Sequence, residues 1–544
     1  EKTSLVKNVN FTNIGPTIMS GRVADIDVNP NNTMEFYVGY ASGGLWYTKN
    51  NGTTFTPVLD SSATQNVGDI AIDWSSGTIW VGTGEKNSSR SSYAGIGVLK
   101  SIDKGKTWNN VGLLDSHHIS RILINPKNTD EVVIGVIGHL YSSNKERGIF
   151  KTTDGGETWT KTLFIDENTG IIDVQPAPNN FETLYAASWE RNRKAWNFHG
   201  NGSKSAIYKS TDAGDSWVKV SDKSGFPMGD GVGRIGLAVY PKNPSIVYAI
   251  VDNNFHQPDT AMQKAADTSR YVLRDFKSLT VDQFLALDDR KLNAFLKSPR
   301  NGIPTKYNAE NIKKDVKSGK LAPDCIWDYL YDANTALFET PIYGAQVYRS
   351  DNAGLSWVKT HAKPLDLYST YGYYFGKVFV SPSNPDKIAI TGVSVLLSTD
   401  GGKTFSSIGK ENVHADHHFV WMNGQRDSHM IIGNDGGCNI TYDNGAHWFK
   451  ANTPAVGQFY NIAIDMAKPY NVYGGLQDNG TWFGSSATKE NYDWYDNGQN
   501  PYTMIGGGDG MQVQVDWRDN KTVYSGSQFG AYSRQNLVTK ERKS

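Results

Sequence analysis

Short apolar runs recur along the whole chain, and each one is only long enough for a β-strand. VADIDVNP (Val23–Pro30), ISRILINP (Ile119–Pro126) and IGLAVYP (Ile235–Pro241) each close on a proline. A second run, such as EFYVGYA, EVVIGVI or SIVYAIV, follows each of them. Their length and their Val, Ile and Tyr content favour strands. Because the linkers are too short for helical crossovers, we expect antiparallel sheets.

One polar turn sequence recurs seven times between these runs, with the pattern S/T-x-D/N-x-G-x-x-W/F. KTTDGGETW at 151–159 is a representative copy. The third residues of the seven copies are Asn50, Asp103, Asp154, Asp212, Asn352, Asp400 and Asp443. Apart from one gap of about 140 residues, the copies lie about 50 residues apart, which is typical of one supersecondary unit per repeat.

The residue types of this turn predict a hairpin. An Asp or Asn side chain accepts backbone N–H bonds from the residues that follow it. The Gly two positions later supplies a positive φ, and the aromatic residue covers the turn. A strand precedes every copy, so each repeat holds four strands and the turn joins its outer two. The sequence therefore predicts an all-β fold, a β-propeller of seven or more four-stranded blades, with the seven Asp and Asn residues in a structural role.

The spelling of the turn resembles the Asp-box, or bacterial neuraminidase (BNR) repeat, of sialidases, sortilin-type propellers and two-propeller xyloglucanases. The wider sequence resembles the sortilin-like "BNR repeat glycosyl hydrolase" proteins of secreted bacterial proteomes. The matching segments include SHHISRILINP, WERNRKAW, ADHHFVW, GNDGGCNITYDNG, GGLQDNGTWFG and GGGDGMQVQVD. The resemblance implies a β-propeller whose ligand is a glycan, a peptide or a protein.

Two segments depart from a plain ring. Apolar residues recur at helical spacing within 256–340, and Thr280 is a plausible N-cap, so we expect an α-helical insertion in the fifth blade on one face of the ring. It would act either as a packing buttress or as a wall over a binding site. After the blades of 1–452, residues 453–544 repeat the strand order without the turn. They would be further blades of the same ring or the start of a second propeller that continues beyond this chain.

Composition narrows the classes of partner. The 544 residues include 54 Lys and Arg and 55 Asp and Glu, and this balance gives no indication of a basic surface for nucleic acid. No apolar run is long enough for a membrane span. The start at Glu1 without Met predicts that an export signal has been removed, and hence a secreted or cell-surface protein. Cys325 and Cys438 could form one bridge or remain two thiols. We expect no cofactor and no metal.

The strand that opens each repeat locates a candidate site. In a propeller these strands line the central channel, and ligands meet the rim where the strands begin. Counting seven residues back from the position before each closing proline, or its equivalent, gives Arg22, Asn66, His118, Asn168, Gly233, Tyr374, Asp416, Gln458 and Asp509. We name these the entrance positions. Together with their neighbours His117, Arg234, His417 and His418 they predict a polar ligand site, although a water-filled channel without a ligand would have the same composition.

Several carboxylates could carry catalysis at this rim. Asp416, Asp509, Glu85 and Glu190 are candidates for the acid and base of a glycoside hydrolase. Asp435 in GNDGG and Asp478 in QDNG are candidate ligand-binding residues in turn-like sequence, which favours an Asx-turn role over a catalytic one. Asp416, His417 and His418 lack the spacing of a known metal motif. The alternative to an enzyme is a non-catalytic, sortilin-like propeller that binds a peptide or protein.

Overall fold

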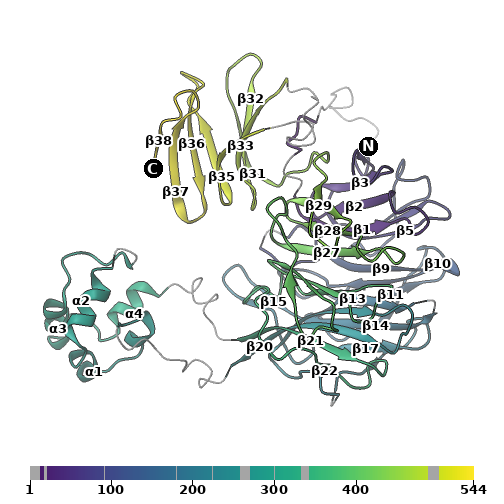
Figure 1. The fold of residues 1–544 in the computed structure, drawn as a ribbon, viewed down its shortest axis with the longest axis horizontal. Coiled ribbons are helices and arrows are strands. Elements are labelled where there is room, and N and C mark those ends of the chain that lie inside the picture. The colour runs from purple at the N-terminus through teal and green to yellow at the C-terminus, as the bar shows by residue number, and fades with distance from the viewer. Residues whose placement is uncertain are drawn as a thin grey trace. The chain divides into compact units, whose positions relative to one another are not determined.

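The chain folds into two compact units, Glu1–Asn254 with Gly344–Ser544, and Phe255–Tyr343 (Figure 1). The computed structural model describes residues 13–17, 21–90, 92–178, 180–222, 224–257, 270–298, 301–331, 342–487 and 502–544. The first unit is built of strands and the second of short helices. The fold class is an all-β propeller with a small helical insertion, as the sequence predicts.

Within the described residues, the first unit contains nine antiparallel four-stranded sheets. Sheets one to three are β1 (Val23–Val28), β2 (Phe36–Tyr40), β3 (Gly44–Thr48), β4 (Thr56–Pro57); β5 (Val67–Asp73), β6 (Thr78–Thr83), β7 (Val98–Ser101), β8 (Asn109–Asn110); and β9 (Ile119–Asn125), β10 (Asn128–Val136), β11 (Gly148–Thr152), β12 (Thr160–Leu163). Sheets four and five are β13 (Thr169–Ala177), β14 (Asn180–Glu190), β17 (Ile207–Ser210), β18 (Val218–Lys219); and β19 (Val232–Val239), β20 (Val247–His256), β21 (Ile342–Ser350), β22 (Val358–Lys359).

The remaining sheets follow the same order. Sheets six and seven are β23 (Lys377–Val380), β24 (Ile388–Thr391), β25 (Val395–Ser398), β26 (Ser406–Ser407); and β27 (His417–Met422), β28 (Met430–Asn434), β29 (Gly437–Thr441), β30 (Phe449–Lys450). Sheets eight and nine are β31 (Phe459–Ile464), β32 (Asn471–Leu476), β33 (Gly480–Ser485), β34 (Thr503–Gly506); and β35 (Gly510–Val515), β36 (Thr522–Ser527), β37 (Ala531–Asn536), β38 (Arg542–Lys543). A small hairpin, β15 (Asn192–Arg193) with β16 (Phe198–His199), extends sheet four, and a 3-10 turn, Gln528–Gly530, precedes β37.

Seven of these sheets close a ring. The first strand of each sheet contacts the first strand of the next, from β1 through β5, β9, β13, β19 and β23 to β27, and β27 contacts β1 again. Buried side chains of sheets one and seven, among them Val23, Phe36, Phe419 and Ile431, form one apolar cluster at the closure. Sheets eight and nine instead pack on each other through β31, β32 and β35. Residues 453–544 therefore add two blades that are not part of this ring.

The repeated turn joins the third and fourth strands of each blade in the ring. In KTTDGGETW, the Thr152 hydroxyl donates to the Asp154 carboxylate at 2.7 Å and accepts the N–H of Gly156 at 3.0 Å. The carboxylate of Asp154 accepts the N–H of Thr158 at 2.9 Å, and Gly156 has a φ of 96°. The indole of Trp159 reaches the preceding blade, where it donates to the carbonyl of Val111 at 2.7 Å. The turn thus stabilises its own hairpin and also ties it to the neighbouring blade.

Acidic residues inside the first strands tie the blades together near the channel. The carboxylate of Asp25 in β1 accepts the N–H of Ile70 in β5 at 3.2 Å. In the same way, Asp69 in β5 accepts from Ile122 in β9 at 2.8 Å. Asp173 in β13 accepts from Leu237 in β19 at 2.9 Å. Each carboxylate satisfies a backbone donor of the next blade that the ladders within the sheets leave free.

The helical unit interrupts sheet five between β20 and β21. It contains a 3-10 turn (Leu273–Phe276), α1 (Val281–Leu285), α2 (Asp289–Leu296), α3 (Ala309–Lys317) and α4 (Cys325–Leu330). Thr280 caps α1 by accepting the N–H of Gln283, as predicted. The helices bury Phe276, Phe284, Leu292, Leu296, Ile312 and Ile326 in a core of their own.

Two further findings bear on the expectations from composition. Cys325 and Cys438 are both free thiols, one partly exposed and one buried. Within the described residues, none of the helices combines the length and the apolar character that crossing a membrane requires.

Candidate functional site

The entrance positions lie where the first strands begin. Arg22, Asn66, His118, Asn168, Asp416, Gln458 and Asp509 come directly before β1, β5, β9, β13, β27, β31 and β35 respectively. Gly233 lies inside β19, and Tyr374 comes shortly before β23. The register counted from the sequence therefore coincides with the start of most of the first strands. It also places residues from distant parts of the chain at the same end of the sheets.

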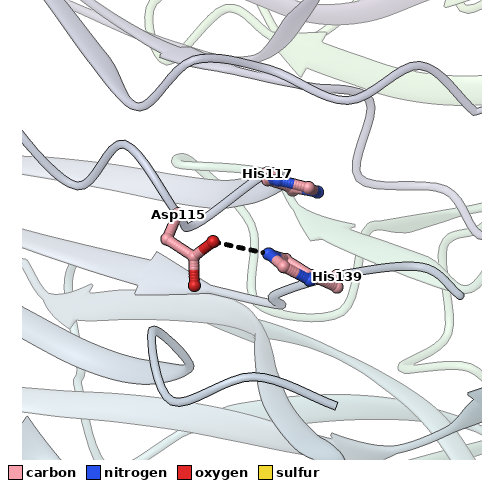
Figure 2. Close-up of side chains that lie close together, drawn as sticks. All are labelled: Asp115, His117 and His139. Carbon is pink, nitrogen blue, oxygen red and sulfur yellow. Dashed lines mark hydrogen bonds and ion pairs between the residues drawn. The ribbon is translucent and has the colours of Figure 1, made fainter. Parts of the chain in front are cut away.

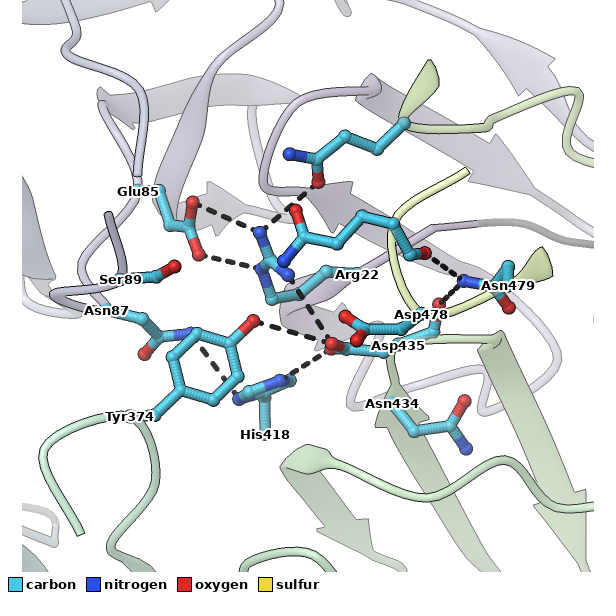
Figure 3. Close-up of polar contacts among 12 residues, drawn as sticks. Arg22, Glu85, Asn87, Ser89, Tyr374, His418, Asn434, Asp435, Asp478 and Asn479 are labelled. Atoms are coloured by element: carbon cyan, nitrogen blue, oxygen red, sulfur yellow. Dashed lines mark hydrogen bonds and ion pairs between the residues drawn. The ribbon is translucent and has the colours of Figure 1, made fainter. Parts of the chain in front are cut away.

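Arg22 is the centre of a buried polar cluster at this end (Figure 3). Its Nε lies 2.7 Å from Oε1 of Glu85, and its Nη2 donates to Oε2 of Glu85 at 3.3 Å. Nη1 donates to Oδ2 of Asp435 at 3.4 Å, and Nη2 also donates to the side-chain carbonyl of Gln458 at 3.3 Å. The side chains of Arg22, Glu85 and Asp435 are only 1 to 2% exposed. A single guanidinium thus contacts two buried carboxylates from different blades.

Asp435 connects Arg22 to a second set of polar side chains. Its Oδ1 lies 2.7 Å from Nε2 of His418, and its Oδ2 accepts the hydroxyl of Tyr374 at 3.4 Å. The other nitrogen of His418 lies 3.4 Å from the side-chain amide of Asn87, whose oxygen accepts from Arg234 at 3.0 Å. The predicted binding residues Arg22, Tyr374, His418, Gln458, Asp435 and Arg234 therefore belong to one network.

The two buried acids of the network have opposite pKa shifts. Burial raises the pKa of Glu85, and Arg22 offsets only part of that rise. Burial would also raise the pKa of Asp435, but Arg22 and His418 together hold it well below its ordinary value. Asp435 is therefore permanently ionised at this end of the ring, which we call the mouth.

Three further carboxylates near Asp435 have access to solvent. Asp478 is exposed, whereas Asp416 and Asp509 are partly exposed. Loss of surrounding water, followed by the charge of Asp435, raises the pKa of Asp416 to about 7. The same two causes, with the charge of Asp509 next, raise the pKa of Asp478 to about 8. The carboxylate of Asp509 accepts the N–H of Asp478 at 2.7 Å. Asp416 and Asp478 therefore change protonation near neutral pH.

The Asx-turn interpretation of Asp435 and Asp478 is wrong. In GNDGG it is Asn434 whose side chain accepts the N–H of Gly436, at 3.0 Å, while Asp435 turns toward Arg22 and His418. Among the hydrogen bonds of the described residues, none from a backbone N–H ends on the Asp478 carboxylate. Its backbone has a φ of 58°, a left-handed conformation that Asp tolerates. The local sequence suggested a turn, but long-range partners determine where these side chains point.

Other predicted residues lie outside this cluster or play another part. Glu190 accepts the N–H of Lys204 at 2.9 Å and so holds a neighbouring loop. His118 is buried and contacts the carbonyl of Glu85 at 2.8 Å, while His117 stacks on His139. The ring of His417 is buried, and its Nδ1 has no hydrogen-bond partner among the described residues. Burial lowers the pKa of His417 to about 3, so this imidazole is neutral.

Sequence reasoning missed a second charged layer deeper in the ring. Nζ of Lys86 lies 2.8 Å from Oδ1 of Asp69 and also donates to the carbonyl of Ser120. Nη1 of Arg121 lies 3.5 Å from Asp69 and 3.7 Å from Asp25. The available signal was an Asp at the same place in VADIDV and VGDIAID, within otherwise apolar strands. A charge there needs a buried partner.

A cavity of about 250 Å³ lies beside this charged layer. It is lined by β9, β13, β19, β23 and β27, with Arg121, Asp173, Gln175 and Lys377 among apolar side chains. The two ends of the first strands thus differ: polar side chains in mutual contact occupy the entrance, and open space follows beyond them.

Solved structures with a similar fold include propellers of two kinds. The GH74 xyloglucanase from Xanthomonas campestris has a TM-score of 0.53 and 13% identity, over 97% of this chain and 74% of that chain. The GH74 enzyme of Niastella koreensis has a TM-score of 0.36 and 14% identity, over 97% and 79% of the two chains. YCF48 bound to D1 peptide has a TM-score of 0.40 and 11% identity, over 78% and 94%.

No protein-family model and no curated protein sequence matches the chain significantly. At 13% identity, the similarity to the xyloglucanase shows a shared β-propeller fold.

Proposed function

We propose that this chain is an exported propeller of the Asp-box type that acts on glycans as a glycoside hydrolase. In this proposal Asp478 is the general acid and Asp416 the general base or nucleophile. The observation that carries it is the presence of two solvent-accessible carboxylates, Asp478 and Asp416, near the ionised Asp435: loss of surrounding water and then the charge of Asp435 raise their pKa to about 8 and about 7 respectively. Glycosidases use one protonated and one ionised carboxyl group, and neighbouring charges separate their pKa values in this way.

Asp435 and Asp509 have supporting parts in this proposal. Asp435 is buried and bound by Arg22 and His418, so it acts through its charge, which favours the protonated form of Asp478. Asp509 accepts the backbone N–H of Asp478 and thereby positions it. The proposal gives the acid role to Asp478 in place of three candidates from the sequence. Glu85 is buried, Glu190 accepts a backbone N–H of a loop, and Asp509 positions Asp478.

The test is turnover of a polysaccharide panel by the full chain, with release of reducing sugar as the readout. We expect Asp478→Asn and Asp416→Asn each to lower kcat by about 100-fold or more, since each removes a group that transfers a proton or attacks in the transition state. Asp222→Asn is the matched control, because this exposed acid follows the outer strand β18 and, within the described part of the chain, its one ion pair is with Lys219 at 2.9 Å. Unchanged activity in both mouth variants would refute the assignment.

The non-catalytic alternative gives a different result in the same experiment. If the wild-type chain binds a glycan without cleaving it, the mouth is a binding site and not an active site. If it neither binds nor cleaves any member of the panel, the glycan proposal fails, and the second interpretation of the sequence, a peptide or protein ligand, is the next to test. Product stereochemistry adds a structural test, since retention requires the two carboxyl groups about 5 to 5.5 Å apart and inversion about 6.5 to 9.5 Å.

A further inference from the structure

Two loops at the entrance end of sheet three bring together Asp115, His117 and His139 (Figure 2). Asp115 and His117 precede β9, and His139 follows β10, so the antiparallel pairing of these strands places the loops side by side. One ligand atom from each residue lies within 4.8 Å of the other two. Nε2 of His139 is 2.9 Å from Oδ1 of Asp115, and the two imidazole rings stack at 3.6 Å.

Neighbouring polar groups hold this cluster in place. Nδ1 of His139 lies 2.8 Å from the hydroxyl of Ser142, which leaves Nε2 to face Asp115. The side chain of Asn144 accepts the N–H of His139 at 3.0 Å and donates to the carbonyl of Asp115 at 2.8 Å. Arg147, which is 1% exposed, donates to the carbonyl of His139 at 2.7 Å. A histidine whose second nitrogen and backbone are both fixed is the arrangement found behind metal ligands.

We propose that Asp115, His117 and His139 bind a divalent transition metal of the Zn²⁺ type, with the remaining coordination position open to solvent. Two imidazoles and one carboxylate are ligands that Zn²⁺ accepts, and three protein ligands leave room for a fourth from solution. The Asp115 side chain is 58% exposed, so the ion would enter from outside. This site replaces the sequence-based expectation that the chain binds no metal.

Metal binding requires one local movement. Stacked imidazoles direct their lone pairs side by side, so the ring of His117 has to turn away from that of His139 to share one ion with it. No hydrogen bond among the described residues involves the His117 ring, which is partly exposed, so the movement changes only its ring contacts, the stacking on His139 and an edge contact with His118 at 6.4 Å. Asp115 and His139, by contrast, already lie within hydrogen-bonding distance and need only admit the ion between them.

The experiment is calorimetric titration of the chelator-treated full chain with Zn²⁺, repeated with Co²⁺ while its visible absorption is recorded. We expect one saturable site and the Co²⁺ spectrum of a four- or five-coordinate ion. His117→Ala, His139→Ala and Asp115→Asn should each weaken binding by at least about tenfold, and Ser142→Ala, which frees Nδ1 of His139, should weaken it by about 10- to 100-fold.

His447→Ala is the matched control. His447 is an exposed histidine with an aspartate at 2.7 Å, Asp443, but no described residue offers this pair a third ligand. Its loss should leave the Zn²⁺ affinity unchanged. The proposal is overturned if the wild-type chain shows no saturable binding, or if binding survives both His117→Ala and His139→Ala. Because all four variants change partly exposed or loop side chains, far-UV circular dichroism will show that they remain folded. The glycan assay is independent, since neither Asp416 nor Asp478 belongs to this site.

Discussion

Replacing Arg22 by Met tests whether one guanidinium holds the mouth of the ring together. The substitution keeps most of the side-chain length but removes the cation that contacts Glu85 at 2.7 Å and Asp435 at 3.4 Å. Both acids are at most 2% exposed, so neither can recover water as a substitute partner. Asp435 retains His418, whereas Glu85 loses its ionic partner.

The expected loss of unfolding free energy is about 3 to 5 kcal/mol, the usual cost of leaving a buried charge without its partner. Glu85→Gln in the same chain removes the charge that Arg22 no longer balances. The double variant Arg22→Met/Glu85→Gln should therefore be more stable than Arg22→Met alone, with a coupling energy of up to about 3 kcal/mol. Arg349→Met is the control, because its ionic partners are exposed carboxylates and such pairs contribute about 1 kcal/mol or less, although the variant also removes a hydrogen bond to the hydroxyl of Tyr248 at 2.9 Å.

Urea unfolding followed by tryptophan fluorescence and far-UV circular dichroism measures these differences at pH 8 and pH 5. Arg22 lowers the pKa of Glu85, so its removal raises that pKa further above the value in the unfolded chain. A carboxyl group with a higher pKa in the folded state takes up a proton on folding, so acid favours the fold. The cost of Arg22→Met should therefore be smaller at pH 5 than at pH 8. A loss below about 1 kcal/mol at pH 8, or an additive double variant, would refute the reasoning.

Three further predictions concern the turn, the rim and the proposed chemistry. Thr152→Val removes a buried hydroxyl from the repeated turn and should cost about 1 to 3 kcal/mol in urea unfolding, and wild-type stability would contradict the hydrogen bonding seen at Gly156. Gly84→Ala should lower Tm far more than Gly319→Ala. Both glycines have a positive φ. A Cβ added at Gly84 would lie 1.7 Å from a carbonyl oxygen, whereas a Cβ added at Gly319 would have no described atom within 4 Å. In the glycan assay, kcat/KM should rise with pH through about 7 and fall through about 8, and a descending limb that survives Asp478→Asn would exclude this residue as the acid.

The repeated turn made the architecture predictable from sequence. Its hydrogen bonds lie within a few residues, as at Thr152, Asp154 and Gly156, so local spelling is enough to locate the hairpin. Residues along a strand are evenly spaced and alternate between its two faces. Counting back from the closing proline therefore identifies the residue at the channel end of each first strand. Arg22 and Asp416 were found in this way, directly before β1 and β27. Ring closure was not predictable, because it depends on contacts between the first and seventh sheets.

The chemistry of the mouth was harder to predict because its partners are distant in sequence. Arg22 and Asp435 are separated by 413 positions, and Asn87 and His418 by 331. Nothing in GNDGG indicates that its aspartate faces an arginine from another blade, and the glycines favour a turn instead. The cluster at Asp115, His117 and His139 was hard to predict for the same reason. His139 comes from the turn that follows β10, and the segment SHH at 116–118 gives no sign of it.

Burial divides the polar mouth into two layers with different roles. In the inner layer Arg22, Glu85, Asp435 and His418 neutralise or hydrogen-bond one another, so a ligand could reach them only by breaking buried ion pairs. The outer layer, Asp416 and Asp478, has solvent access, and the charge of Asp435 is the strongest electrostatic cause of the raised pKa of both. Arg22 therefore acts on Asp478 in two opposing ways: it keeps Asp435 ionised, and the charge of Asp435 raises the pKa of Asp478, while the guanidinium's own charge lowers that pKa.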